Sequence, residues 1–320
     1  MTYDRRKTFP LNPVRRVVGL PFGSMRSQRR GTGSDIADVR EYRPGDDPRK
    51  IDFRASARLS AARNTDEFVV REHHSDESVG VLLFVDRRPS MAAFSADFPG
   101  SWFQKSQALV TAGTMIVNSA VEASCSVGYL DYSRYDHPDA SRKRREYFWR
   151  PPNQETEAKR VKERNLLYPA FFAPQDNLAM GLWQLQKFNR SIPKGSFVFI
   201  LSDFLVVPDE KIWDEALAMG WDIVPVVLQD PVWERSFPDV SGITLPMRDP
   251  ATQQTSRVRF SEREVSMRRF ENEARFEDLI ALFERLGCDF VMPERHDEET
   301  IHRAFLDWAR QRSSSRRVRR

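Results

Sequence analysis

The sequence predicts an α/β fold, a doubly wound and mainly parallel sheet with an N-terminal extension and an inserted hairpin. From Val79 onward, short apolar runs typical of strands buried on both faces alternate with segments of helical spacing. The chain has 320 residues, 40% of them hydrophobic, which is enough to bury a full core. Such alternation places helices on both faces of a parallel sheet.

The predicted elements follow one another in a regular order. "VGVLLFVD" (79–86) is the first strand, Trp102–Ala123 has helical spacing, and "CSVGYLDY" (125–132) is the second strand. Turn and capping residues bound the elements that follow. They are a helix over 176–188, a strand over 195–204, a helix over 209–220 closed by Gly220, and a strand over 221–230.

The α/β domain is predicted to extend over 79–310 and to end with a hairpin, a helix, a strand and a helix. These are a hairpin over 242–260 laid onto the core, a long helix over 261–286, a strand "CDFVMP" (288–293) and an amphipathic helix with Ile301, Phe305 and Trp308 on one side. An insertion over 132–172 interrupts the domain. It is long enough to be functional or partly disordered, and its sequence assigns it no role.

Ahead of this domain, residues 1–30 form an N-terminal arm and residues 31–78 a charged segment. Within it, "YRPGDDPRKIDFRASAR" (42–58) has a turn signal at Pro44-Gly45 and predicts a short helix from Pro48. Alternating Arg and Asp favour a fixed ion-pair network, with Ile51 and Phe53 pinning it, although a solvated charged surface is the alternative. The network residues are Asp46, Asp47, Arg49, Asp52, Arg54 and Arg58.

Composition argues for a cytoplasmic protein. No run reaches the eighteen or so apolar residues that span a bilayer, and no apolar segment follows the charged start "MTYDRRKTFP", so neither a membrane span nor a signal peptide is expected. Cys125 and Cys288 each lie in apolar stretches, which predicts buried thiols.

The formal net charge of +4 comes largely from two basic stretches. They are the run "RKRRE" (142–146) and the C-terminal residues 311–320, which we expect to be a basic disordered tail. Neither is accompanied by zinc-finger spacing or an aromatic-interleaved RNA motif, so no specific nucleic acid is expected as a partner.

Acidic side chains follow the predicted strands at Asp86, Asp131, Asp203 and Asp230. In doubly wound folds the carboxyl ends of the strands form the site. One such carboxylate often only caps the next helix, but several together suggest a divalent cation such as Mg²⁺ or Mn²⁺.

The strand-end stretches and the charged segment resemble two nested families. "FVDRRPSM" and "FILSDF" are similar to the von Willebrand factor type A (vWA) domain, a Rossmann-type fold whose metal site uses Asp-x-Ser-x-Ser, a Thr and a late Asp. "GTGSDIADVREYRPGDDPRKIDFRASAR" resembles the signature of the bacterial family called domain of unknown function 58, and the likeness extends over 31–310. In this chain Phe53 replaces the usual Trp of that signature.

The resemblance implies a degenerate metal or adhesion site. Asp86, Ser90 and Asp203 match its pattern, Arg88 stands where a Ser hydroxyl would coordinate, and Asp176 is assigned to the Thr position. The guanidinium favours a metal-free, Arg-paired site, because a like-charged cation would be repelled, whereas the additional Asp176 favours bound Mg²⁺ or Mn²⁺. Both versions stay open.

For function, the resemblance implies a non-catalytic interaction module that acts as an adaptor or co-chaperone with a MoxR-type AAA+ ATPase. The sequence has no Gly-rich phosphate loop, HExxH or Gly-x-Ser-x-Gly elbow. The alternative is a Mg²⁺-dependent phosphoesterase using Asp86, Asp131 and Asp203. His73 and His74 would point to opposite sides of an extended segment, so they are not expected to be joint ligands.

Overall fold

The structure is a computed structural model. It describes residues 7–13, 30–41, 51–63, 68–74, 79–93, 103–133, 147–153, 156–167, 170–252 and 254–318. Among these residues, no helix combines the length and the apolar character needed to cross a membrane.

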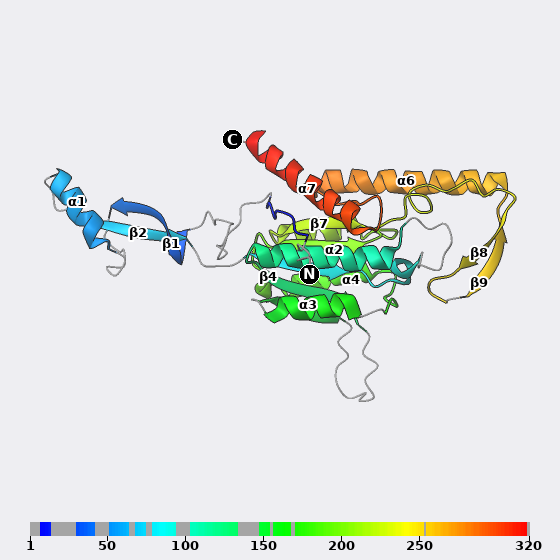
Figure 1. Cartoon of the computed structure of the whole chain (residues 1–320), viewed down its shortest axis with the longest axis horizontal. Helices are drawn as coiled ribbons and strands as arrows, with labels where there is room; N and C mark the ends of the chain where they lie inside the picture. The colour runs from blue at the N-terminus through cyan, green and yellow to red at the C-terminus, as the bar shows by residue number, and fades with distance from the viewer. Residues whose placement is uncertain are drawn as a thin grey trace, which may run out of the picture.

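The centre of the molecule is a five-stranded sheet in the order β5-β4-β3-β6-β7 (Figure 1). Four strands are parallel, and β5 pairs antiparallel to β4 at one edge. The predicted doubly wound, mainly parallel sheet is confirmed. The strands are β3 (Gly80–Val85), β4 (Ser126–Tyr132), β5 (Tyr147–Asn153), β6 (Phe197–Ser202) and β7 (Asp222–Val227).

Side-chain alternation along the strands divides the core into two layers. On β3, Val81, Leu83 and Val85 join one cluster, whereas Leu82 and Phe84 join the other. Because both of their faces are covered, inner strands such as β3 and β6 are almost wholly apolar, which is why they were recognisable in the sequence. The first layer packs against α2 (Lys105–Glu122), α3 (Thr156–Leu167) and α7 (Glu298–Val318); the second packs against α4 (Asn177–Lys187), α5 (Glu210–Ala218) and α6 (Glu262–Leu286).

Helix α4 approaches the sheet closely because Gly181 has no side chain. A Cβ atom placed there would lie 2.0 Å from Cζ of the buried Phe84 ring. We expect Gly181→Ala to lower the free energy of unfolding by about 1–3 kcal/mol, because overpacking outweighs the helix propensity that alanine adds. Chemical denaturation tests this. Gly181→Ala should cost less in a Phe84→Leu background, and equal costs in both backgrounds would contradict the steric explanation.

The insertion contributes ordered structure at the sheet edge. Strand β5 and helix α3 both come from it, and no strand was predicted there from the sequence. β5 carries Pro151 and Pro152, which an edge strand tolerates because one side needs no ladder hydrogen bonds. The basic run 142–146 lies outside the described residues.

The predicted hairpin is present but is not laid onto the core. Strands β8 (Thr244–Arg248) and β9 (Thr255–Arg259) pair only with each other within the described residues, and they project with the N-terminal end of α6 (Figure 1). At its base the hairpin packs against a small separate cluster of Phe237, Phe260 and Val265. The prediction was wrong because the hairpin buries its few apolar side chains there.

The last predicted strand, 288–293, is reduced to a single bridge between Val291 and Val226. Val291 N–H donates to Pro225 O at 2.8 Å and Val291 O accepts from Val227 N–H at 2.8 Å, after which the chain turns toward α7. Cys125 and Cys288 are both buried and are not joined in a disulfide, which confirms the prediction of buried thiols.

The C-terminal tail differs from the prediction of disorder from 311 onward. Helix α7 continues to Val318, and Arg312 is buried, with Nη1 and Nη2 at 2.8 and 3.0 Å from the carboxylate oxygens of Asp222. A guanidinium group can be buried when a carboxylate binds it bidentately. The sequence did not reveal this pair, because Arg312 lies among many other charged residues.

A truncation series tests how much of α7 the fold needs. Deleting Ser313–Arg320 should cost no more than about 1 kcal/mol, because Ser313 and Ser314 are exposed and their hydrogen bonds to Asn12 and Gln311 lie at the surface. Starting the deletion at Arg312 instead should lower the melting midpoint clearly, since Asp222 then loses its buried partner. Equal midpoints for the two truncations, measured by circular dichroism, would rule out the Arg312 contribution.

The N-terminal residues 7–13 pack into the main domain. Phe9 stacks on Phe305 with ring centroids 4.3 Å apart, and its N–H donates to Ser119 Oγ at 2.9 Å. Farther along, β1 (Arg30–Glu41) pairs antiparallel with β2 (Val69–His74), and α1 (Phe53–Arg63) lies between them in sequence. These elements correspond to the charged segment.

The helix of the charged segment begins later than predicted. Residues 42–50, including Pro48, lie outside the described part, and Ile51 and Asp52 are not helical. Asp52 Oδ1 instead accepts from the N–H groups of Arg54 at 3.0 Å and Ala55 at 3.1 Å, so it caps the helix that begins at Phe53.

Candidate functional site

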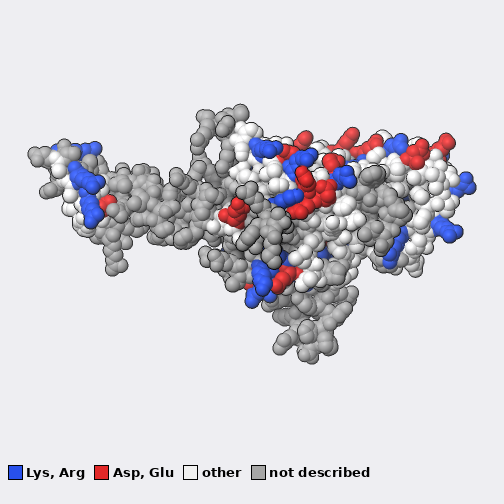
Figure 2. Space-filling view, viewed as in Figure 1, with Lys and Arg blue, Asp and Glu red and all other residues white. Residues whose placement is uncertain are grey.

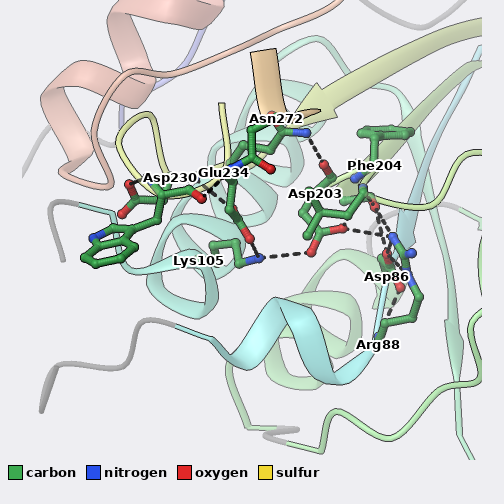
Figure 3. A network of polar contacts seen from close by, with 12 residues as sticks. Asp86, Arg88, Lys105, Asp203, Phe204, Asp230, Glu234 and Asn272 are labelled. Atoms are coloured by element: carbon green, nitrogen blue, oxygen red, sulfur yellow. Dashed lines mark hydrogen bonds and ion pairs between the residues drawn. The ribbon is translucent and has the colours of Figure 1, made fainter. Parts of the chain in front are cut away.

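The site is built where β3 and β6 end side by side at the carboxyl edge of the sheet. Asp86 directly follows β3 and Asp203 directly follows β6. Arg88 lies between the two carboxylates: its Nε donates to Asp86 Oδ2 at 2.8 Å and its Nη2 to Asp203 Oδ1 at 2.9 Å (Figure 3). All three side chains are buried. One guanidinium therefore joins both strand-end carboxylates.

Neutral donors complete the coordination of Asp86. Ser202 Oγ donates to its Oδ2 at 2.7 Å, and Asn177 Nδ2 and the Arg88 N–H donate to its Oδ1 at 2.8 and 3.0 Å. Arg88 Nη2 also reaches Ser202 Oγ at 3.1 Å. A buried carboxylate is tolerated only when it is paired and hydrogen-bonded, and Asp86 meets both conditions.

On the other side of Asp203 lies Lys105, the first residue of α2. Its Nζ donates to Asp203 Oδ2 at 3.0 Å and to Glu234 Oε1 at 2.5 Å, and no part of its side chain is exposed. A cation at a helix N-terminus opposes the helix dipole. The two carboxylates offset this cost, so Lys105 extends the ion pairs from Asp203 to Glu234.

The pKa directions follow from these contacts. Burial would raise the pKa of Asp203, but Lys105 and then Arg88 outweigh it, so this pKa lies below its usual value. Burial raises the pKa of Glu234 above its usual value, and Lys105 offsets this only in part while Asp203 adds to it. Burial alone would lower the pKa of Lys105, but Asp203 and Glu234 hold it above the usual value.

The turn after β6 is held in an uncommon backbone conformation. Phe204 has φ of 49°, in the left-handed region that non-glycine residues rarely adopt. Its N–H donates to Ser202 Oγ at 3.0 Å, and its buried ring meets Phe283 edge to face at 5.3 Å. Packing of this ring holds the turn that directs Asp203 toward Arg88 and Lys105.

Asp131, the third strand-end carboxylate, belongs to a separate network. Arg164 of α3 binds it through Nε at 3.0 Å and Nη2 at 2.8 Å, and Arg87 Nε lies 3.2 Å from Oδ2. Tyr129 OH donates to the same oxygen at 3.1 Å, and burial raises the pKa of this tyrosine. Arg87 and Arg88 thus serve different networks, and Arg164 attaches the insertion to the sheet.

Asp230 acts as a turn residue. Its Oδ1 accepts from the N–H groups of Val232 and Trp233 at 2.8 and 3.0 Å. Its own N–H donates to Glu234 Oε2 at 2.9 Å, which orients Glu234 toward Lys105. Asp230 therefore caps the turn that follows β7 and not a helix.

The assignment of Asp176 to the Thr position was wrong. Asp176 is exposed at the start of α4, and its side chain makes no capping hydrogen bond. The next residue, Asn177, is buried and contacts Asp86. Ser90 is placed as predicted, because its side chain hydrogen-bonds to Asp203.

The charged segment gives only partial information on the predicted ion-pair network. Asp46, Asp47 and Arg49 lie outside the described residues. Arg54 and Arg58 are exposed on α1, and Phe53 is 68% exposed, so it does not pin the segment to a core. The side chains of the two predicted edge-strand histidines, in β2, are likewise not described.

The same geometry bears on metal ligation. Within the described part of the chain, no three His, Cys, Asp or Glu side chains are grouped so as to hold an ion. The Asp86 and Asp203 oxygens that would face a cation accept instead from Arg88, at 2.7 to 2.9 Å. While Arg88 is in place, the carboxylate oxygens of Asp86 and Asp203 are not arranged to coordinate a divalent cation.

The sheet topology and the strand-end Asp and Ser residues define a vWA-like α/β domain. The chain belongs to the family described as "Protein of unknown function DUF58", whose profile matches residues 38–278. No curated protein matches the chain.

Solved structures resemble the chain at low identity. The pilus adhesin SpaC of Lactobacillus rhamnosus GG is 11% identical with a TM-score of 0.42, and the match covers 73% of this chain but 30% of the adhesin. BatB of Bacteroides thetaiotaomicron is 12% identical with a TM-score of 0.39, covering 74% and 99%. An aerotolerance-related membrane protein of Bacteroides fragilis NCTC 9343 is 12% identical with a TM-score of 0.36, covering 73% and 99%.

Proposed function

We propose that this chain is a non-catalytic protein-interaction module whose docking face is the carboxyl edge of the sheet. The observation that carries the proposal is the Arg88 guanidinium bonded to both Asp86 and Asp203. Lys105 binds the remaining oxygen of Asp203. The negative charges of the two strand-end carboxylates are therefore neutralised by cations of the protein itself. The site is then a rigid support for its loops, and it functions without a metal.

The loops above this network offer apolar contact surface. Phe172 and Val206, each 42% exposed, lie in the loops before α4 and after β6. The first loop is fixed by the Ala173 N–H, which donates to Arg87 O at 3.0 Å, and the second by the Leu205 N–H, which donates to Asp203 Oδ1 at 3.1 Å. Exposed apolar side chains on fixed loops favour binding of a protein surface.

For the partner, we propose a MoxR-type AAA+ ATPase, with this chain as its adaptor or co-chaperone in the cytoplasm. The support is the family resemblance of the charged segment and the vWA-like domain. The phosphoesterase alternative is disfavoured because it needs Asp86, Asp131 and Asp203 in one site, whereas Asp131 is bound by Arg87 and Arg164 in a separate network.

The experiment is a pull-down from the source bacterium with surface variants that leave the buried network intact. Wild type should capture an AAA+ ATPase, and Phe172→Ser combined with Val206→Ser should lose it. Val121→Ser combined with Trp183→Ser, at comparably exposed positions elsewhere, is the matched control and should retain capture. Equal capture by all three proteins, or Mg²⁺-dependent hydrolysis of p-nitrophenyl phosphate by wild type, would overturn the proposal.

A further inference from the structure

The β8–β9 hairpin has one basic face. Thr244 pairs with Arg259, Pro246 with Arg257, and Arg248 with Thr255. Paired residues point to the same side of an antiparallel ladder and side chains alternate along a strand, so the three arginines share one face. All three are exposed, and among the described residues none of them forms an ion pair. Figure 2 shows basic atoms over this hairpin, whereas acidic and basic atoms are interspersed along α6.

The outer edge of β9 pairs with no other strand in the part of the chain that the structure describes. The Asp249 N–H donates to Gln254 O at 2.9 Å, which fixes the phase of the ladder. By alternation, the N–H and C=O groups of Thr255, Arg257 and Arg259 then point away from β8. The matching edge of β8 is interrupted by Pro246, which has no N–H. β9 therefore offers the continuous edge.

The hairpin is held rigidly at its base. Phe237 and Phe260 pack edge to face at 5.4 Å, and the Arg268 guanidinium lies 5.1 Å from the Phe260 ring centre. On α6, Asn272 Nδ2 donates to Ser236 O, and Arg269 Nε donates to Phe237 O at 3.0 Å, so the preceding loop is fixed as well. A fixed edge costs less ordering entropy when a partner binds.

We propose that the edge of β9 binds an extended, acidic segment of a partner protein by strand addition. Backbone hydrogen bonds to the free edge would supply affinity, and carboxylates at alternate positions of the segment would meet Arg248, Arg257 and Arg259. Strand addition requires a peptide backbone, which distinguishes this partner from nucleic acid or an anionic membrane. The surface is distinct from the carboxyl-edge face and does not depend on an ATPase partner.

The test uses a fluorescein-labelled decapeptide of alternating glutamate and valine, with anisotropy as the readout at low and at physiological salt. Wild type should bind it, and Arg248→Ser, Arg257→Ser and Arg259→Ser together should weaken binding by about tenfold, as expected for the loss of three exposed ion pairs. The matched control removes three exposed charges elsewhere, with Lys159→Ser, Arg303→Ser and Arg310→Ser, and should bind like wild type.

Two further comparisons separate edge pairing from simple charge attraction. A peptide N-methylated at every residue keeps its charge but has no N–H group to donate along either edge, so it should not bind. Thr255→Pro should weaken binding, and Thr244→Pro on the other strand should not. Equal binding of the methylated peptide, or tighter binding of a single-stranded DNA 12-mer or of anionic vesicles, would overturn the proposal. The Phe172→Ser, Val206→Ser variant should bind the peptide normally, so this proposal and the carboxyl-edge proposal can fail separately.

Discussion

Replacing Lys105 with methionine should lower the free energy of unfolding by about 3–5 kcal/mol at pH 7, the range found when one partner of a buried ion pair is removed. Methionine keeps most of the volume but leaves Asp203 and Glu234 buried without the cation that bridges them. Their mutual repulsion adds to the cost. Urea denaturation of wild type and variant measures the difference.

The same substitution should be least harmful in acid. In wild type the pKa of Asp203 lies below its usual value, so its contribution to stability is present above the unfolded pKa and is lost as pH falls through the folded pKa. Without Lys105 the pKa values of Asp203 and Glu234 both rise, and protonation relieves their repulsion. The difference in the free energy of unfolding between wild type and Lys105→Met should therefore narrow as the pH falls from 7 toward 5.

Two variants serve as controls for this experiment. Lys159→Met removes a lysine whose side chain is 84% exposed and should change stability by less than about 0.5 kcal/mol. Adding Glu234→Gln to Lys105→Met should recover part of the loss, because it removes one of the two buried negative charges that Lys105 binds in wild type. A pH-independent gap, or no recovery in the double variant, would mean that Lys105 contributes packing rather than charge.

The sheet could be predicted because burial on both faces leaves strands with almost no polar residues, as in β3 and β6. Strand β5 was missed because an edge strand is free of that constraint, and its two prolines resemble a loop. The strand predicted at 288–293 failed for the opposite reason: its apolar residues fill the core beside β7, while the backbone forms a single bridge.

At the site, the residues that directly follow strands could be predicted from the sequence. The residues that other helices and loops contribute to the network were missed. Asp86, Arg88, Ser90 and Asp203 lie together as predicted, because parallel strands bring their carboxyl ends to one edge. Neither Lys105 nor Glu234 belongs to a recognisable motif, and Glu234 lies in a loop. One available signal was Lys105 itself, a cation at the N-terminus of an otherwise apolar helix.

Replacing Arg88 with serine should create a divalent-cation site that wild type lacks. The guanidinium occupies the space between Asp86 and Asp203, so its removal takes one donor away from an oxygen of each carboxylate and removes a positive charge. The new hydroxyl adds a hard oxygen donor beside Ser90, which suits Mg²⁺ or Mn²⁺. Lys105 still holds the other oxygen of Asp203, which limits the gain.

We expect Arg88→Ser to bind Mn²⁺ more tightly than wild type by at least about tenfold, or 1.4 kcal/mol, in isothermal titration near pH 7. Its melting temperature should rise with Mn²⁺ concentration, since a ligand of the folded state stabilises it by mass action. Arg88→Lys keeps the charge and should not bind. Tight binding by wild type that Arg88→Ser fails to improve would show that the guanidinium does not exclude the cation, and the phosphoesterase would then become the stronger candidate.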